Sequence, residues 1–434
     1  MVDEREDPRG LLTLTASGLA VGALAGLVAS AFHFALDGAE RLFAAVLAWS
    51  SEYPIAGAVV PALIGAAAAF ASRGLVRHYA PEASGSGVQQ VEAVIRGEAA
   101  AMRGQVLPVK FIGGVLALCT GMALGREGPM VQMGATVGHL WSRWFGLHRR
   151  DGRALLAAGA GAGLAAAFNA PLAGAVFVFE ELLRRFELRA AVATLSACSA
   201  GLVIMRALTG NRLVFAAPPI VVDVFPGYFL FLLLGAAVGL LGVLYSRMIV
   251  VALDVTERIR GVTPEAKAAV VGAIVGMLAW FVPSVVGSGE AQVQAVLDGG
   301  HSLAFVGILF GVRLLLGPLC YAPGLPGGLF APLLIIGAAA GLAFGIVAES
   351  AMPAMTTPTA AFASVGMATL FVAVVRAPVT GIALVVEMTG ATGLFIPLLT
   401  ACASATAVPA LLGCAPIYDT LRDRDAARLA ATQR

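Results

Sequence analysis

The sequence is poor in charge: only 12% of its 434 residues are Asp, Glu, Lys or Arg, whereas 59% are hydrophobic. A water-soluble domain of this length needs more polar surface than that. The formal net charge is only +2, and no basic cluster with interleaved aromatic residues occurs. The composition therefore excludes a soluble globular protein, and the charge gives no argument for nucleic-acid binding.

Cysteine and histidine are also scarce, with five residues of each. The cysteines stand singly in or beside apolar runs, without a CxxC pair or a Cys/His cluster. Small buried hydrophobic residues are the expected role for them. No His-Glu-x-x-His pattern occurs, and the Gly-Ser-Gly segments lack a recognisable base partner. We expect no metal site, no cofactor and no enzyme activity.

Long apolar runs, by contrast, recur from one end of the chain to the other, and the mean hydropathy is +0.89. Several runs reach the roughly 20 residues that a helix needs to cross a bilayer. A transmembrane barrel would alternate apolar and polar residues instead. The runs lie at about 11–36, 55–72, 105–124, 154–179, 190–208, 228–253, 268–286, 303–322, 329–348, 360–375, 378–386 and 393–412. The sequence thus predicts an all-α polytopic membrane protein.

The chain begins with "MVDEREDPRG", which is acidic and lacks the features of a signal peptide. We expect the first apolar run to be a mature membrane helix. The expected organisation is a cytoplasmic tail at 1–10, membrane repeats at 11–215 and 216–420, and a second cytoplasmic tail at 421–434.

The two halves of the chain resemble each other in three segments that occur in the same order. The pairs are "GSGVQQVEAVIRG" (85–97) with "GSGEAQVQAVLDG" (287–299), "GREGPMVQMG" (125–134) with "GLFAPLLIIG" (328–337), and "NAPLAGAVFVFEE" (169–181) with "RAPVTGIALVVEM" (376–388). Each later segment follows its partner by about 200 residues. Such repeats are typical of transporters, whose substrate site lies near the bilayer midplane between the repeats.

Basic loops predict a hairpin inside the first repeat. Segments 142–153 and 182–189 are both rich in arginine, so the positive-inside rule puts both on the cytoplasmic side. The apolar segment between them must then enter and leave on one side. Asn169 and Pro171 interrupt helical hydrogen bonding in its middle. We therefore expect two shorter helices, with an equivalent break at "VRAP" in the second half.

Three glycine-rich segments predict helices that begin inside the membrane. A helix N-terminus has unpaired N–H groups and a partial positive charge, so it binds anions. Glycine lets an anion approach the backbone, and proline suits the first turn. "GREGP", "GGLFAP" and "GSGV" all follow this pattern, and Ser86 adds a hydroxyl donor. Three such starts converging would form a site for a small anion without a full counter-charge.

Glu127 lies in one of these helix starts, where an anion would bind. An ionised carboxylate there mimics the anion, and a protonated one should withdraw, which makes it both a gate and a proton carrier. The alternative is a structural acid near the helix N-terminus that pairs with Arg126. An ionisable residue inside a membrane is a functional hypothesis by default.

Together, "GSGV", "GREGP", "GLFAP" and the late Tyr418 resemble the CLC family of chloride channels and transporters, in order over roughly residues 80–420. The resemblance is to the bacterial exchanger type, without cytoplasmic CBS domains. It implies a CLC-like fold of two repeated halves with broken and re-entrant helices.

The resemblance also implies roles for individual residues. Ser86 and Tyr418 would bind the central chloride through hydroxyls, and Gly85 belongs to the same segment. The residues whose amides would contribute are Leu329 and Phe330 at the central site, and Arg126, Glu127 and Gly128 at an outer site. Glu127 would be the gate, Glu181 the inner proton carrier with Glu92 as its acidic neighbour, and Lys110 a supporting residue of the conduction path.

Three positions leave alternatives open. Tyr418 would also suit an ordinary interfacial aromatic residue, and Ser86 would also suit a helix cap. Glu181 precedes Arg184 and Arg185 and would also suit a salt-bridged residue at the interface, whereas Glu180 and Glu387 occupy matching repeat positions and suit a structural role. Gln89 stands where the family pattern has proline, which leaves an extra N–H at the helix start.

A chloride/proton antiporter is the leading functional prediction. The alternatives are a passive chloride channel of the same fold, an exchanger for another small anion, and a cation-coupled solute carrier. Chloride, protons and the lipid bilayer are the expected partners, nucleic acid is not, and the resemblance implies a homodimer. The expected location is the inner cell membrane, with both termini cytoplasmic.

Overall fold

The computed structural model describes residues 8–53, 56–211, 213–217, 222, 227–352 and 357–432. The described part of the chain is helical, apart from one isolated backbone bridge. The first half contains α1 (Pro8–Ser50), α2 (Val59–Tyr79), α3 (Val88–Arg96), α4 (Val106–Leu118), α5 (Glu127–Trp144), α6 (Arg149–Phe168), α7 (Pro171–Phe177) and α8 (Leu188–Thr209). The all-α prediction is confirmed.

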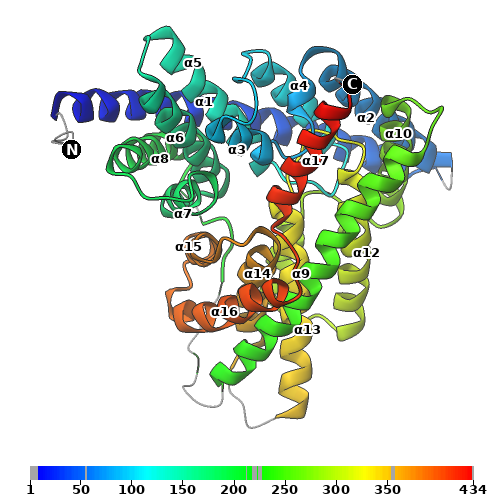
Figure 1. Ribbon diagram of the computed structural model, residues 1–434. Helices are drawn as coiled ribbons and strands as arrows, with labels where there is room; N and C mark the ends of the chain where they lie inside the picture. Colours follow the sequence, from blue (N-terminus) through cyan, green and yellow to red (C-terminus); the bar gives the residue numbers. More distant parts are fainter. Residues whose placement is uncertain are drawn as a thin grey trace.

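The second half repeats this order of long and short helices. It contains α9 (Gly227–Arg258), α10 (Pro264–Phe281), α11 (Glu290–Asp298), α12 (Leu303–Tyr321), α13 (Phe330–Ala351), α14 (Thr359–Val375), α15 (Pro378–Thr389) and α16 (Phe395–Leu411), followed by α17 (Ile417–Thr432). In Figure 1, α5–α8 lie together beside α1, whereas α2 lies beside α10 of the second half and α17 runs back alongside α3.

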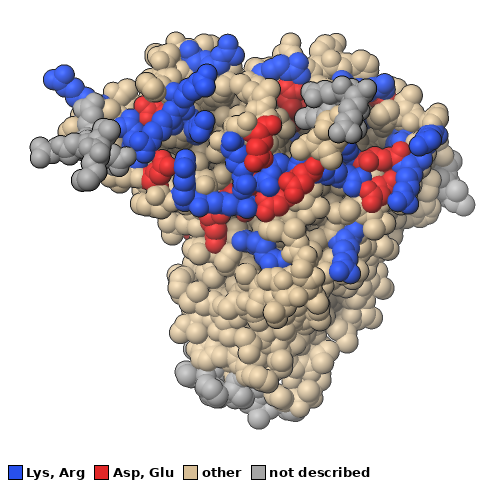
Figure 2. All heavy atoms as spheres, viewed as in Figure 1, with Lys and Arg blue, Asp and Glu red and all other residues tan. Residues whose placement is uncertain are grey.

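Eight helices in the described part of the chain are long and apolar enough to cross a membrane. They include the 43-residue α1 and the 32-residue α9, whereas α3, α7 and α11 are much shorter. In Figure 2 the charged side chains gather in a band over one half of the visible face, and the other half is almost uncharged. Such a division suits a protein that meets both water and lipid.

Both predicted helix breaks are present. α6 ends at Phe168, Asn169 adopts a left-handed conformation with φ 54°, and α7 begins at Pro171. In the second half Arg376 has φ 72° between α14 and α15. A left-handed residue followed by a helix-initiating proline thus ends one helix and begins the next in both repeats.

The two basic loops of the first repeat lie on one side of the molecule, as predicted. Arg189 Nη2 lies 2.8 Å from Asp151 Oδ1, which joins the start of α8 to the start of α6. α6 and the following α7 therefore leave and return to the same side.

Small residues allow the helices to pack closely. A side chain at Gly22 of α1 would collide with the backbone of Ala197 in α8, and one at Gly65 of α2 would collide with Gly272 of α10. Close backbone approach through small residues is the usual basis of helix association in membranes.

The helices extend beyond some of the expected boundaries. α1 begins at Pro8, inside the segment 1–10 that was expected to be a tail, and continues to Ser50 rather than ending near residue 36. The segment 421–434 was also expected to be a tail, but α17 continues through it to Thr432. The expected boundary between residues 420 and 421 lies inside α17, because the polar residues after Tyr418 continue the helix that carries this tyrosine.

Candidate functional site

The glycine-rich loops of the two repeats are bonded to each other. Gly125 N–H donates to the Gly328 carbonyl at 2.8 Å, and Gly328 N–H donates back to Gly125 at 2.7 Å. Gly327 N–H donates to the Gly85 carbonyl at 3.1 Å. The starts of α3, α5 and α13 therefore meet at one place between the repeats, as the sequence predicted.

Several N–H groups at these helix starts lack a partner. Among the described residues, no hydrogen-bond acceptor is found for the backbone N–H groups of Gly128, Leu329 and Phe330, whereas the N–H group of Glu127 lies against its own carboxylate. All four residues are fully buried. Unpaired N–H groups in a buried place are costly unless a ligand satisfies them, and a helix N-terminus favours an anion.

Two buried hydroxyl groups lie beside these helix starts. Ser86 and Tyr418 are both 0% exposed, the tyrosine hydroxyl lies against Ser86, and neither oxygen has a hydrogen-bond partner among the described residues. A Cβ atom added to Gly128 would lie only 2.6 Å from Ser86 Oγ, so this hydroxyl also borders the start of α5. The arrangement provides hydroxyl and amide donors around one small volume.

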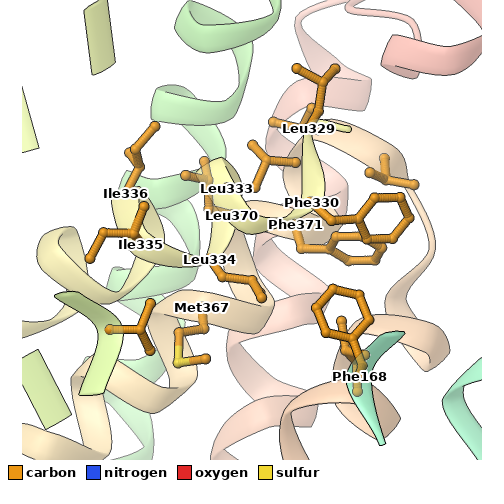
Figure 3. Close-up of a cluster of buried hydrophobic side chains, with 14 of the residues drawn as sticks. Phe168, Leu329, Phe330, Leu333, Leu334, Ile335, Ile336, Met367, Leu370 and Phe371 are labelled. Atoms are coloured by element: carbon orange, nitrogen blue, oxygen red, sulfur yellow. The ribbon is translucent and has the colours of Figure 1, made fainter. Parts of the chain in front are cut away.

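Aromatic packing encloses the site on the side of α13. The Phe330 ring lies 6.2 Å from the Tyr418 ring and 4.9 Å from that of Phe371, measured between centroids. Figure 3 shows Phe330 among Phe168, Phe371 and the leucines of α13. This cluster fixes the first turn of α13 and surrounds its free N–H groups with apolar material.

Glu127 is 0% exposed, and both of its carboxylate oxygens lack a hydrogen-bond partner among the described residues. The carboxylate lies against the Ala331 N–H at the start of α13, and a side chain at Gly125 would collide with Glu127 Oε2. A carboxylate from the first repeat therefore lies at a helix start of the second.

A purely structural role of Glu127 implied an ion pair with Arg126. Arg126 does not form this pair and has other partners. Arg126 Nη2 lies 2.9 Å from Glu290 in α11, and its Nη1 lies 3.0 Å from His33 Nδ1 in α1. Glu290 and His33 are distant in sequence, so nothing in the motif itself indicated them as partners.

Lys110 is fully buried and supports the loop that begins α3. Its Nζ donates to the carbonyls of Ala83 at 3.0 Å and Gly85 at 2.7 Å. The second repeat has an equivalent that sequence reasoning missed. Arg313 of α12 donates to Gly287 O at 2.6 Å and Val286 O at 2.8 Å. The constant spacing between the repeats was the signal that would have identified Arg313.

Glu181 is buried in a π-helical turn, Val178–Leu182, that follows α7. Its Oε1 lies 3.7 Å from Arg184 Nη2, too far for a hydrogen bond, and has no other partner among the described residues. Arg185 pairs instead with Glu187 at 2.9 Å. The alternative, in which Glu181 is a salt-bridged residue at the interface, is therefore supported only by this one long ion pair.

Glu92 lies in an ionic cluster close to Glu181. Its Oε1 contacts Arg422 at 2.8 Å, Arg96 at 2.5 Å and Arg184 at 3.3 Å. Arg184 is therefore shared between Glu92, Glu181 and Asp419, of which Asp419 is the nearest at 2.8 Å. The structure brings the two predicted acids together, through an arginine that was not among the predicted site residues.

Two separate cavities approach the site. One, of about 840 Å³, includes Ser84, Gly85, Gln89 and Tyr321 in its lining. The other, of about 640 Å³, includes Glu180, Glu181 and Arg184. The residues that line the two cavities do not overlap, so Glu181 and the Gly85 loop open toward different spaces.

These features define a membrane transport protein of two repeats, with helix N-termini around a buried carboxylate. A family model described as "Voltage gated chloride channel" matches residues 64–410. The chain belongs to this family, which is the one that its motifs resemble.

Curated relatives and a solved structure match nearly the whole chain. The chain is 40% identical to the H(+)/Cl(-) exchange transporter ClcA of Vibrio parahaemolyticus, over 93% of this chain and 88% of that protein. It is 35% identical to ClcA of Klebsiella pneumoniae, over 100% and 92% respectively. The structure of a slow cyanobacterial Cl-/H+ antiporter superposes with a TM-score of 0.92, at 31% identity and covering 97% of this chain and 99% of that one.

Proposed function

We propose that this protein is a chloride/proton antiporter of the cell membrane. The observation that carries the proposal is the Glu127 carboxylate, buried without a hydrogen-bond partner at helix starts whose N–H groups are also unpaired. A carboxylate and a chloride ion are alternative ligands for such groups. The names of the exchangers that the chain resembles support the same function.

Chloride is proposed to bind to the hydroxyls of Ser86 and Tyr418 and the amides of Leu329 and Phe330. All these groups are donors, so together they replace water around a small anion without a full positive charge. The amides at Arg126 and Gly128 are proposed to form the outer position. Lys110 acts indirectly, because its ammonium group holds the Gly85 carbonyl in place.

Protons are proposed to move between Glu127 and Glu181, with Glu92 holding Arg184 beside the inner acid. The carboxyl groups of Glu127 and Glu181 are both near enough to the Tyr418 hydroxyl for their charges to act on it. The non-overlapping cavities suit separate routes, with protons entering beside Glu181 and chloride entering beside Gly85. Binding of chloride displaces the Glu127 carboxylate, which favours its protonation and couples the two fluxes.

The proposed test is flux from proteoliposomes with chloride and pH recorded together. An imposed chloride gradient should drive protons uphill in the opposite direction. Chloride flux without any proton movement would identify a passive channel and contradict the antiporter. Replacing chloride by fluoride or nitrate in the same assay identifies the preferred anion.

A homodimer with one pathway in each subunit is proposed on the family resemblance. Exposed apolar side chains on α7, α8, α15 and α16 offer a surface for it; they include Leu172, Leu195, Val203, Val379 and Ile396. Cross-linking in the membrane would test the dimer. The proposed orientation has both termini in the cytoplasm of an inner membrane, which accessibility labelling of residues 9 and 430 would test.

A further inference from the structure

Gln89 stands where the family pattern has proline, and its side chain contacts two residues of the second half. It is only 6% exposed, and it lies against Tyr321, the last residue of α12, and Asp425 of α17. Asp425 follows Tyr418 by seven residues, about two helical turns, so both occupy the same face of α17. A proline at position 89 has no polar side-chain group with which to make these contacts.

The Tyr321 side chain packs against the backbone that precedes α3. Its side chain is 3% exposed, and its hydroxyl oxygen accepts from Ser86 N–H at 3.4 Å. A Cβ atom on Gly85 would lie 2.9 Å from the same oxygen. The hydroxyl thus lies beside the Gly85–Ser86 peptide, and Tyr321 helps to line the 840 Å³ cavity.

The neighbours of this hydroxyl determine where its hydrogen is directed. The carboxamide oxygen of Gln89 has no partner among the described residues, so its NH₂ group is the part that faces Tyr321 and Asp425. Ser86 N–H donates to the Tyr321 oxygen, and the NH₂ group of Gln89, also a donor, lies against the same side chain. The hydrogen of the Tyr321 hydroxyl then remains for another acceptor, and none is found for it in the described part of the chain.

The cavity beside Tyr321 suits an anion. Basic residues from three helices and one loop, namely Arg73, Arg103, Lys267, Arg424 and Arg428, slightly outnumber the acidic residues of its walls, which are Glu82, Glu98, Glu257 and Asp425. Hydroxyl groups that accept hydrogen bonds become stronger donors because the bonds polarise one another. The buried, unpaired hydroxyls of Ser86 and Tyr418 lie just beyond Tyr321. Tyr321 both lines the cavity and contacts Ser86, so its hydroxyl lies between the cavity and these two groups.

We propose that Tyr321 is an additional anion ligand at the inner mouth of the chloride pathway, oriented by the Ser86 amide and the Gln89 side chain. The proposal rests on the proposed transport of chloride. The Tyr321 hydroxyl donates the first hydrogen bond to a chloride ion that enters from the cavity. The ion then passes to Ser86 and Tyr418. Gln89 is a positioning residue that directs the hydroxyl without touching the ion.

Tyr321→Phe tests the proposal because it keeps the ring and its packing and removes only the donor. Loss of one hydrogen bond to an ion should weaken binding about tenfold. The measurements are chloride binding to the purified full-length protein by calorimetry, and KM for chloride at the cavity side of oriented proteoliposomes. Both constants should rise, while the ratio of protons to chloride stays unchanged.

Tyr245→Phe is the matched control. Tyr245 of α9 is also 0% exposed with an unpaired hydroxyl, but it does not line the cavity. This substitution should leave chloride binding and KM unchanged. Gln89→Leu keeps the Tyr321 hydroxyl and removes the group that orients it, so it should raise KM by a smaller factor. Gln89→Leu also tests the proposal if Tyr321→Phe fails to fold.

Unchanged binding and KM in Tyr321→Phe would overturn the proposal. Tighter binding would overturn it too, because the hydroxyl would then be competing with chloride for Ser86 N–H. Failure of the proposed function is recognised separately: the wild-type protein would show no chloride/proton exchange. Calorimetry would still report whether Tyr321 binds the anion in that case.

Discussion

Glu180 and Glu387 each cap a helix of the other repeat. Glu180 accepts from Val379 N–H at 2.9 Å and Thr380 N–H at 2.7 Å, at the start of α15. Glu387 accepts from Leu172 N–H at 3.1 Å and Ala173 N–H at 2.8 Å, at the start of α7. This reciprocal pairing supports a structural role for both acids and leaves the adjacent Glu181 as the candidate proton carrier.

Glu180→Gln and Glu387→Gln should therefore lower stability without uncoupling transport. Each substitution replaces a charged acceptor by a neutral one at a helix N-terminus, which costs on the order of 1 kcal/mol. Thermal unfolding in detergent should show a lower midpoint for either variant, and the proton-to-chloride ratio should remain that of the wild type. Complete loss of proton transport in Glu387→Gln would contradict the structural assignment, since Glu387 is remote in sequence from the proposed proton route.

Glu127→Gln should keep chloride transport and abolish proton coupling. Glutamine is nearly isosteric with protonated glutamate, cannot carry a proton, and competes poorly with chloride for the amides at the helix start. Chloride flux should also become almost independent of pH. Bromide should occupy the position of the carboxylate, which anomalous scattering from a soaked crystal would reveal. Retained coupling and normal pH dependence in this variant would remove Glu127 from the mechanism.

Glu181→Gln should stop proton movement while chloride still flows, because it removes a titratable group that is not among the proposed chloride ligands. Glu180→Gln is its matched control, since the neighbouring carboxylate undergoes the same chemical change in its capping position. The assay is simultaneous recording of chloride and pH during efflux. If proton coupling survives in Glu181→Gln, the inner proton carrier must be another residue.

The helix starts and breaks were predictable because local sequence determines them. Pro171, Asn169 and the glycines of "GREGP" restrict the backbone wherever they occur, so the sequence alone indicated these features. The contacts of Arg126 with Glu290 and His33 were not predictable, because they join helices that are far apart in the chain.

Arg313 and Tyr321 were missed for different reasons. Arg313 lies outside the glycine motifs, although repeat symmetry with Lys110 would have identified it. Tyr321 precedes the motif "GGLFAP" by several residues. Its proposed role depends on a three-dimensional contact with Ser86 and Gln89. An apolar run that contains a single tyrosine reads as ordinary membrane sequence.

Chloride affinity at the cavity side should rise as the pH falls through about 6. Asp425 lies on α17, outside the apolar membrane helices, and burial raises the pKa of its carboxyl to about 6 despite its contacts with Gln89 and Arg424. At pH 7 this group is mostly ionised and repels an anion beside Tyr321; its protonation removes that repulsion.

Asp425→Asn should therefore bind chloride at pH 7.5 as tightly as the wild type does at pH 5.5. The other charged side chains on the cavity walls are Arg73 of α2, Glu257 of α9, Lys267 of α10, Arg424 and Arg428 of α17, and Glu82, Glu98 and Arg103 of the connecting segments. Hydrogen bonds with Arg103 hold the pKa of Glu82 below its usual value against the effect of burial, so this acid stays ionised across the range. Calorimetric titration of chloride at both pH values measures the effect. Asp423→Asn is the control, because its exposed carboxylate is outside the cavity lining. A pH dependence that persists unchanged in Asp425→Asn would assign the titration to a different group.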